Sequence, residues 1–117
     1  MLAFKNRFHG RGIVRAVLRT GLAVRTDTLT YKYRRSPHRR HPRIAVVVSK
    51  KIQKSAVGRN RIRRRLYEEF RQRLDQLEPS SDIVVIVTSG GIVHMSSQEL
   101  HRLVDDSLIQ TGLYKTP

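Results

Sequence analysis

The sequence predicts a small α/β (α+β) two-layer sandwich, in which helices pack on a mixed β-sheet in the order α-β-β-α-β-α. Two continuous apolar runs, 44–48 and 83–87, have the length and composition of buried strands. Residues 55–77, which lie between them, repeat their apolar positions with a helical period and predict a long connecting helix. At 117 residues the chain has the size of one domain, and we expect 1–117 to form a single domain.

The N-terminal part of the chain predicts an arm and a short helix. Residues 1–10 show no clear period, and we expect an extended basic arm with Phe4 and Phe8 as apolar anchors. Over 11–20 the apolar residues form one helical stripe, which ends at Gly21, a residue type that commonly stops helices.

The middle of the chain predicts two strands and a loop. Apolar and polar residues alternate over 24–34, as they do in a half-buried strand. The stretch 35–42 contains two prolines, two histidines and three arginines, so we expect a flexible basic loop. The next strand, 43–49, is apolar over most of its length, and we therefore expect it to be central in the sheet.

The C-terminal part of the chain carries the clearest helix signals. Ser55 is the expected N-cap of the long helix. A third strand is expected over 82–88, buried on both sides. Ser96 and Glu99 form a capping box, which predicts a final helix that ends at Gly112.

The charge of the chain points to a polyanionic partner. The chain has 24 Lys and Arg against 9 Asp and Glu, a net charge of +15. Residues 1–73 carry 22 Lys and Arg against 3 acids, +19, whereas residues 74–117 carry 2 against 6, −4. Such self-repulsion destabilises a compact state unless a polyanion neutralises it. We therefore expect nucleic acid as the first partner, bound by the first two-thirds of the chain.

Composition also indicates the compartment. The chain contains no cysteine, which excludes disulfides and thiolate metal sites and suits a reducing environment. The longest apolar runs are five residues, far short of a membrane span, so we expect no membrane partner. A cytoplasmic protein is the expected result.

The segment 50–73 is the most informative part of the sequence. On a helical wheel its apolar residues occupy one side and a nearly continuous basic face occupies the other. Arg59 and Arg63 fall in the apolar sector, so either the helix overhangs its sheet there or both arginines face a bound polyanion. Arginine makes bidentate contacts with phosphate. The candidate residues for binding a nucleic acid are Lys50, Lys51, Lys54, Arg59, Asn60, Arg61, Arg63, Arg64 and Arg65.

Three segments in this order resemble the bacterial ribonuclease P protein family. They are RIAVVVSKK at 43–51, GRNRIRRRLYEEFR at 58–71 and DIVVIV at 82–87. Residues 5–21 fit the N-terminal arm and first helix of the family more loosely, and the resemblance covers most of the chain. The Arg-Asn-Arg signature that follows a strand ending in Ser-Lys-Lys is its most specific feature.

The resemblance implies a left-handed βαβ crossover in a ribosomal protein S5 domain 2-like fold. It also implies the protein subunit of ribonuclease P, a ribonucleoprotein endonuclease whose catalytic RNA, with Mg²⁺ bound mainly by the RNA, removes the 5′ leader of precursor tRNA. No catalytic residue, protein metal site or further protein partner is expected. The single-stranded leader would lie between the first helix and the sheet, where the candidate groove residues are Val14, Leu18, Tyr31 and Tyr33.

Two alternatives stay open at this point. Val14 and Leu18 stand where the family often places aromatic residues, and Tyr31 and Tyr33 belong either to the groove or to the core. The alternative function is a ribosomal or general RNA-chaperone basic protein with no hydrolytic partner. The acidic residues lack the spacing of metal ligands, so we expect no independent nuclease site.

Overall fold

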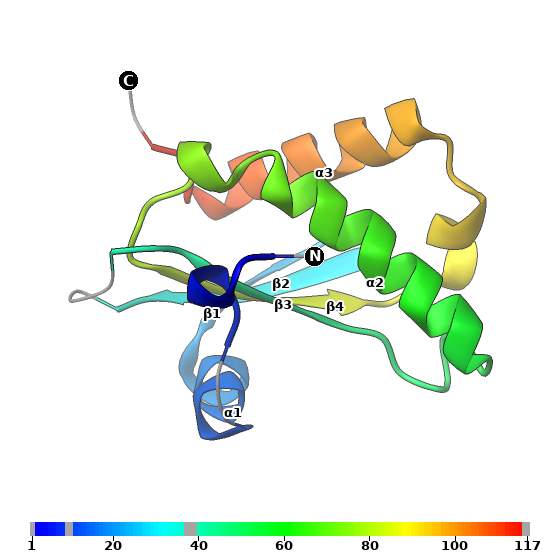
Figure 1. Cartoon of the computed structure of the whole chain (residues 1–117), viewed down its shortest axis with the longest axis horizontal. Coiled ribbons are helices and arrows are strands. Elements are labelled where there is room, and N and C mark those ends of the chain that lie inside the picture. Colours follow the sequence, from blue (N-terminus) through cyan, green and yellow to red (C-terminus); the bar gives the residue numbers. More distant parts are fainter. Residues whose placement is uncertain (1, 9–10, 37–39, 116–117) are drawn as a thin grey trace.

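One mixed four-stranded sheet organises the molecule. The computed structural model describes residues 2–8, 11–36 and 40–115 (Figure 1). The strands are β1 (Leu22–Arg25), β2 (Leu29–Arg35), β3 (Arg43–Val47) and β4 (Ser81–Val87), in the sheet order β1-β2-β4-β3. β3 and β4 are parallel, and the other neighbouring strands are antiparallel. The predicted mixed sheet is confirmed, and β3 and β4 form the parallel pair that a βαβ crossover requires.

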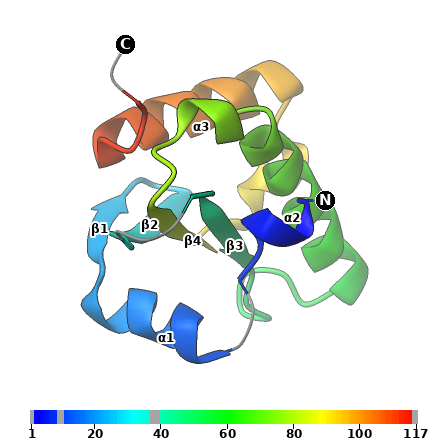
Figure 2. The ribbon, with the colours of Figure 1, turned by 60° about the vertical axis from the view of Figure 1, so that its left-hand side comes forward.

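Helices cover both faces of this sheet. They are α1 (Arg11–Thr20), α2 (Ala56–Arg71) and α3 (Ser97–Thr111), with short 3-10 turns η1 (Phe4–Asn6), η2 (Leu74–Gln76) and η3 (Gly90–His94). Figures 1 and 2 show α2 and α3 on one face and α1 on the opposite face. No helix in the described ranges combines the length and the apolar character needed to cross a bilayer.

The predicted helix caps are present. The Ser55 hydroxyl accepts a hydrogen bond from the Gly58 N–H at 3.1 Å, and the Ser96 hydroxyl accepts one from the Glu99 N–H at 3.1 Å. Gly112 ends α3 in the left-handed conformation, at φ 70°. Only the end of α2 differs from the prediction: the helix stops at Arg71, and the remaining residues to 77 form η2 and its flanks.

The predicted strand 24–34 is wrong, because the structure divides it in two. β1 and β2 are antiparallel, and Thr26 closes the turn between them. The backbone N–H of Thr26 donates to the Leu29 carbonyl at 2.8 Å, and the Thr26 hydroxyl accepts from the Leu29 N–H at 3.0 Å. The element order is therefore α-β-β-β-α-β-α.

The predicted central position of the strand 43–49 is also wrong. Within the described part of the chain β3 pairs only with β4, so it lies at an edge of the sheet. An apolar run indicates burial, and here the burial comes from α2 packing against this edge strand. At its outer edge the backbone N–H of Val46 donates to the hydroxyl of Tyr67 on α2 at 3.0 Å.

The main core lies between the sheet and the α2–α3 layer. Tyr31 is fully buried there, packs edge-on against Phe70 at a centroid distance of 6.3 Å, and shares a 2.7 Å hydrogen bond with Ser107. Side chains alternate along each strand, so every second residue of the sheet points away from the main core toward α1. On this face Val84 of β4 and Val17 of α1 are both fully buried. Each face of the sheet is therefore covered by a different helical layer.

The N-terminal segment docks differently from the expectation. Phe4 is 68% exposed and is therefore not the predicted anchor. Leu2 is buried in the main core instead, and buried Asn6 donates from its side-chain amide to the Pro42 carbonyl at 3.0 Å. Phe8 is half-buried. Residues 1, 9 and 10 of the expected arm, and residues 37–39 of the expected loop 35–42, lie outside the described residues.

Candidate nucleic-acid interface

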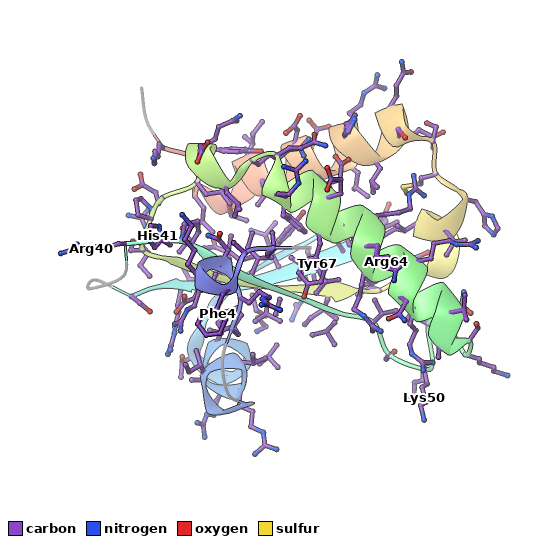
Figure 3. All side chains as sticks on the ribbon, in the orientation of Figure 1. Phe4, Arg40, His41, Lys50, Arg64 and Tyr67 are labelled. Atoms are coloured by element: carbon purple, nitrogen blue, oxygen red, sulfur yellow. The ribbon has the colours of Figure 1, made fainter. Side chains whose placement is uncertain are left out.

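Six predicted residues form an exposed polar surface, which we call the α2 basic surface. They are Lys50, Lys51, Lys54, Asn60, Arg61 and Arg64. In Figure 3, Lys50 projects beyond the first turns of α2, and Arg64 projects from the helix itself. Within the described chain, the side chains of Arg61 and Arg64 have no hydrogen-bond or ion-pair partner, so their guanidinium groups are available to an external anion.

The other three predicted residues already bind protein groups. Arg59 donates to the backbone carbonyls of Gln53 and Lys54, at 3.0 and 2.8 Å, and so ties the preceding loop to α2. Arg63 donates to the side-chain carbonyl of Asn60 at 2.6 Å. Neither Arg59 nor Arg63 is buried unpaired, although both are half-buried.

Of these three arginines, Arg65 makes the contacts that join the most distant parts of the chain. Its guanidinium donates to the backbone carbonyls of Ile92 and Met95, both at 2.6 Å. These carbonyls belong to η3 and the residue that follows it, so Arg65 holds this turn against α2. Part of the basic run therefore stabilises the fold and is only partly available to RNA.

Two hollows lie along the exposed side of α2. One, of about 410 Å³, is lined by Val57, Asn60, Arg61, Arg64 and Arg65. The other, of about 470 Å³, is lined by Asn60, Arg63, Arg64 and Tyr67. Asn60 and Arg64 line both hollows. Guanidinium groups around a concave surface are well placed to bind phosphate.

A third and larger hollow lies between α1 and β3, and we call it the α1 groove. It has a volume of about 510 Å³ and is lined by Arg7, Phe8, Val14, Arg15, Ile44, Ala45 and Tyr67. Apolar and aromatic side chains form most of its surface, and two arginines stand at its walls. This combination suits a single-stranded nucleic acid, because bases stack on aromatic rings while cations bind the backbone.

The predicted groove residues divide between the two faces of the sheet. Val14 lines the α1 groove as expected, and Leu18 is half-buried on α1 outside its lining. Tyr31 is fully buried in the main core, and Tyr33 packs against that core from the same side of β2. The assignment of Tyr31 and Tyr33 to the groove is therefore wrong, and the core alternative is right.

Sequence reasoning missed the aromatic residues that do line the groove, Phe8 and Tyr67. The position of Tyr67 offered a signal, because it lies four residues after Arg63 and seven after Asn60 and so shares their side of the helix. Phe8 offered none beyond its aromatic character, because its segment has no periodicity.

A buried ion cluster positions Phe8. Asp82 is fully buried, and the register places it beside Arg34 on one neighbouring strand and Arg43 on the other. Arg43 donates to both Asp82 carboxylate oxygens at 2.8 Å, and the Ser36 hydroxyl donates at 2.7 Å. The Arg43 guanidinium also lies 5.0 Å from the centre of the Phe8 ring. A cation–π contact therefore connects the groove wall to the sheet.

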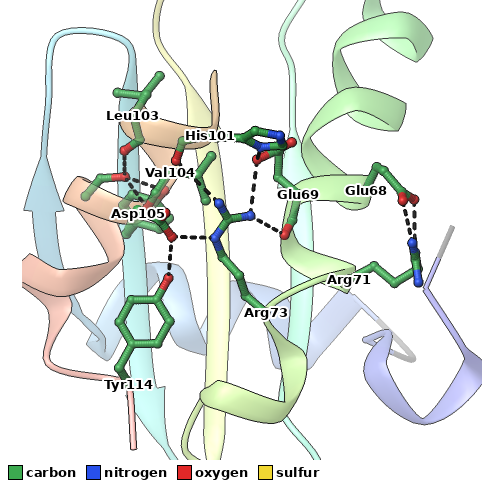
Figure 4. A network of polar contacts seen from close by, with 11 residues as sticks. Glu68, Glu69, Arg71, Arg73, His101, Leu103, Val104, Asp105 and Tyr114 are labelled. Carbon is green, nitrogen blue, oxygen red and sulfur yellow. Dashed lines mark hydrogen bonds and ion pairs between the residues drawn. The ribbon is translucent and has the colours of Figure 1, made fainter. Parts of the chain in front are cut away.

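A second polar network joins α2 to α3 (Figure 4). Arg73 donates to Asp105 at 2.7 Å and to the Glu69 side chain at 3.1 Å, and His101 also contacts Glu69. The Tyr114 hydroxyl donates to Asp105 at 3.0 Å. The hydrogen bond from Arg73 holds the pKa of the Asp105 carboxyl below its ordinary value, and burial together with Asp105 raises the pKa of Tyr114 to about 12. These groups neutralise one another and act as an interhelical clamp.

We expect Asp105→Asn to lower the melting temperature by a few degrees at neutral pH and the difference to vanish in acid. Because the pKa of Asp105 is depressed in the folded protein, its carboxylate stabilises the fold above the ordinary pKa of 3.8. This contribution is lost as the pH falls through the lower folded value. Thermal melts from neutral pH to about pH 2 measure it, with Asp106→Asn as the exposed control. A difference independent of pH would contradict the assignment.

Comparison with known proteins gives a consistent result. The family described as Ribonuclease P matches residues 2–111 of the chain. A ribonuclease P protein component of Pseudanabaena sp. is 40% identical over 89 residues, which cover 76% of this chain and 77% of the relative. That of Vibrio campbellii is 45% identical over 65 residues, covering 56% and 53%.

Solved structures show the same fold. The RNase P protein of Staphylococcus aureus superposes with a TM-score of 0.82 at 21% identity, covering 94% of this chain and 98% of that protein. The RNase P protein of Thermotoga maritima gives 0.68 at 23% identity, covering 90% and 93%. The family match over most of the sequence and the shared fold agree: the chain belongs to the ribonuclease P family, as its protein component.

Proposed function

We propose that this protein component binds the catalytic RNA with the α2 basic surface and the single-stranded 5′ leader of precursor tRNA in the α1 groove. The observation that carries the proposal is the pair Arg61 and Arg64, exposed and without a protein partner in the described chain, beside an aromatic groove. The first feature suits folded RNA, whose phosphates are densely spaced. The second suits unpaired nucleotides, whose bases can stack.

The proposal assigns the hydrolytic chemistry to Mg²⁺ ions bound mainly by the RNA. In the described ranges no group of three His, Asp or Glu side chains is arranged to hold a metal ion. The contribution of the protein is positive charge and positioning, which hold a leader against the RNA despite mutual phosphate repulsion. We place this activity in the cytoplasm, in keeping with the absence of cysteine from the chain.

Reconstitution with a bacterial catalytic RNA tests the proposal. We expect the protein to stimulate cleavage of precursor tRNA at low Mg²⁺, because its cations substitute for part of the counterion requirement of RNA assembly. The protein alone should not cleave the substrate. The measurement is the rate of 5′-leader release with and without the protein over a Mg²⁺ titration.

The alternative function makes the opposite prediction. A ribosomal or general RNA-chaperone protein would bind a ribosomal subunit tightly and would leave the cleavage rate at low Mg²⁺ unchanged. That pair of results would overturn the proposal, and so would leader release by the protein without the catalytic RNA.

A further inference from the structure

Tyr67 is shared by the α1 groove and by the hollow on α2 that Asn60, Arg63 and Arg64 also line. It lines both, together with Phe8 and Val14 on one side and with Arg63 and Arg64 on the other. Figure 3 shows its side chain directed from α2 toward the sheet. A nucleic acid strand that occupies both hollows would therefore lie against this side chain in each of them.

The hydroxyl of Tyr67 is held in place as an acceptor, which leaves it able to donate. The Val46 N–H at the outer edge of β3 donates to this oxygen at 3.0 Å. Among the described residues no acceptor takes the hydroxyl proton of Tyr67. A hydroxyl that accepts one hydrogen bond is polarised and becomes a stronger donor. The fold thus provides a fixed donor at the junction of the two hollows.

The charges around this donor indicate the acceptor that it would meet. Arg7 and Arg15 line the groove side, and Arg63 and Arg64 line the α2 side. Four arginines in the linings of the two hollows that share Tyr67 favour an anionic oxygen over a neutral one. In a single-stranded RNA that oxygen belongs to a phosphodiester, because the bases carry no charge at neutral pH.

We infer that Tyr67 is a leader-binding residue, whose hydroxyl donates a hydrogen bond to one phosphodiester oxygen where the strand leaves the α1 groove for the α2 basic surface. The inference rests on the proposed function and adds to it a path for the strand. It also gives the edge strand β3 a second role, since Val46 fixes the orientation of the donor.

Tyr67→Phe in the reconstituted holoenzyme tests this inference. The variant keeps the ring and removes only the hydroxyl. We expect about a tenfold loss of affinity for precursor tRNA, the size expected for one hydrogen bond to a charged group. The affinity for tRNA without a leader should not change. Tyr33→Phe is the matched control, because Tyr33 also packs against the main core but is not among the residues that line the three hollows, so the change should alter neither affinity.

A methylphosphonate scan of the leader identifies the acceptor. Neutralising the contacted phosphate should weaken binding of the wild-type holoenzyme more than binding of Tyr67→Phe, because the variant no longer has the hydroxyl to lose. Equal penalties in wild type and variant at every position would overturn the inference. So would an unchanged affinity of Tyr67→Phe, or an equal loss with and without a leader, which is the result expected if the hydroxyl only caps β3.

The same titrations separate this inference from the proposed function. If the wild-type holoenzyme binds tRNA with and without a leader equally well, leader binding itself is refuted and the inference falls with it. If the wild type prefers the leader and Tyr67→Phe retains the full preference, only the role of Tyr67 is refuted. Should Tyr67→Phe not fold, the wild-type scan still decides, since the absence of any sensitive leader phosphate would overturn the inference.

Discussion

Replacement of Asp82 by alanine is expected to lower the free energy of unfolding by about 3–5 kcal/mol, the cost of breaking a buried ion pair from one side. Asp82 is fully buried and accepts two hydrogen bonds from Arg43 and one from Ser36. Without the carboxylate, the buried Arg43 guanidinium keeps its charge and loses its counterion. Removing one partner is costly for this reason, even where the intact pair contributes little net stability.

Urea denaturation followed by far-UV circular dichroism measures this loss, and it suits a chain without tryptophan. Asp106→Ala is the matched control: it removes an exposed aspartate from α3 and should change the free energy by less than about 0.5 kcal/mol. If Asp82→Ala changes the free energy of unfolding as little as Asp106→Ala does, the expectation is wrong, and water or another acceptor bonds to the Arg43 guanidinium.

The second large effect is expected on RNA affinity. Arg61→Ala combined with Arg64→Ala should weaken binding of the catalytic RNA by on the order of 30-fold at physiological salt, about 1 kcal/mol per lost phosphate contact. Both side chains are exposed and have no partner in the described chain, so the fold should not change. The same basic run also contains Arg59 and Arg65, which are unsuitable for this test because they bind backbone carbonyls.

The salt dependence of binding provides the sharper measurement. Each lost phosphate contact should reduce the slope of log K against log salt by about 0.7 to 0.9, so the double variant should reduce it by about 1.4 to 1.8. Arg102→Ala on α3 is the control, since Arg102 is exposed but distant in sequence from the basic run. An unchanged slope would remove the α2 basic surface from the interface, whatever the change in affinity.

Local signals in the sequence predicted the helices well. Ser55, Ser96 and Gly112 mark helix ends through bonds within a few residues, and the structure contains each of them as predicted. The division of 24–34 into β1 and β2 escaped notice because its turn has neither glycine nor proline. Thr26 closes that turn with its side chain and backbone instead.

Properties that depend on the whole sheet were harder to predict. An apolar run such as 43–49 indicates burial but does not specify position in the sheet, and here α2 covers an edge strand. The ion cluster of Asp82 depends on the pairing of β4 with two other strands, which composition does not reveal.

The same limit applies to the candidate site. The helical wheel placed Arg61 and Arg64 on an exposed face, as the structure has them. It could not show that Arg65 binds carbonyls 27 and 30 residues farther along the chain. For Tyr31, period-two alternation allowed either face, and only the tertiary contact with Ser107 decides between them.

Phe8 belongs both to the wall of the α1 groove and to the contact that seats the N-terminal segment on Arg43. Seating of this segment and occupation of the groove are therefore thermodynamically linked, and each strengthens the other by the same factor. Leu2 and Asn6 order the segment when the protein folds, so the entropy cost of ordering it is not charged to RNA binding. An incoming strand therefore binds to a groove wall that is already ordered. Substitutions that loosen this seating should therefore weaken RNA affinity without removing a single contact to RNA.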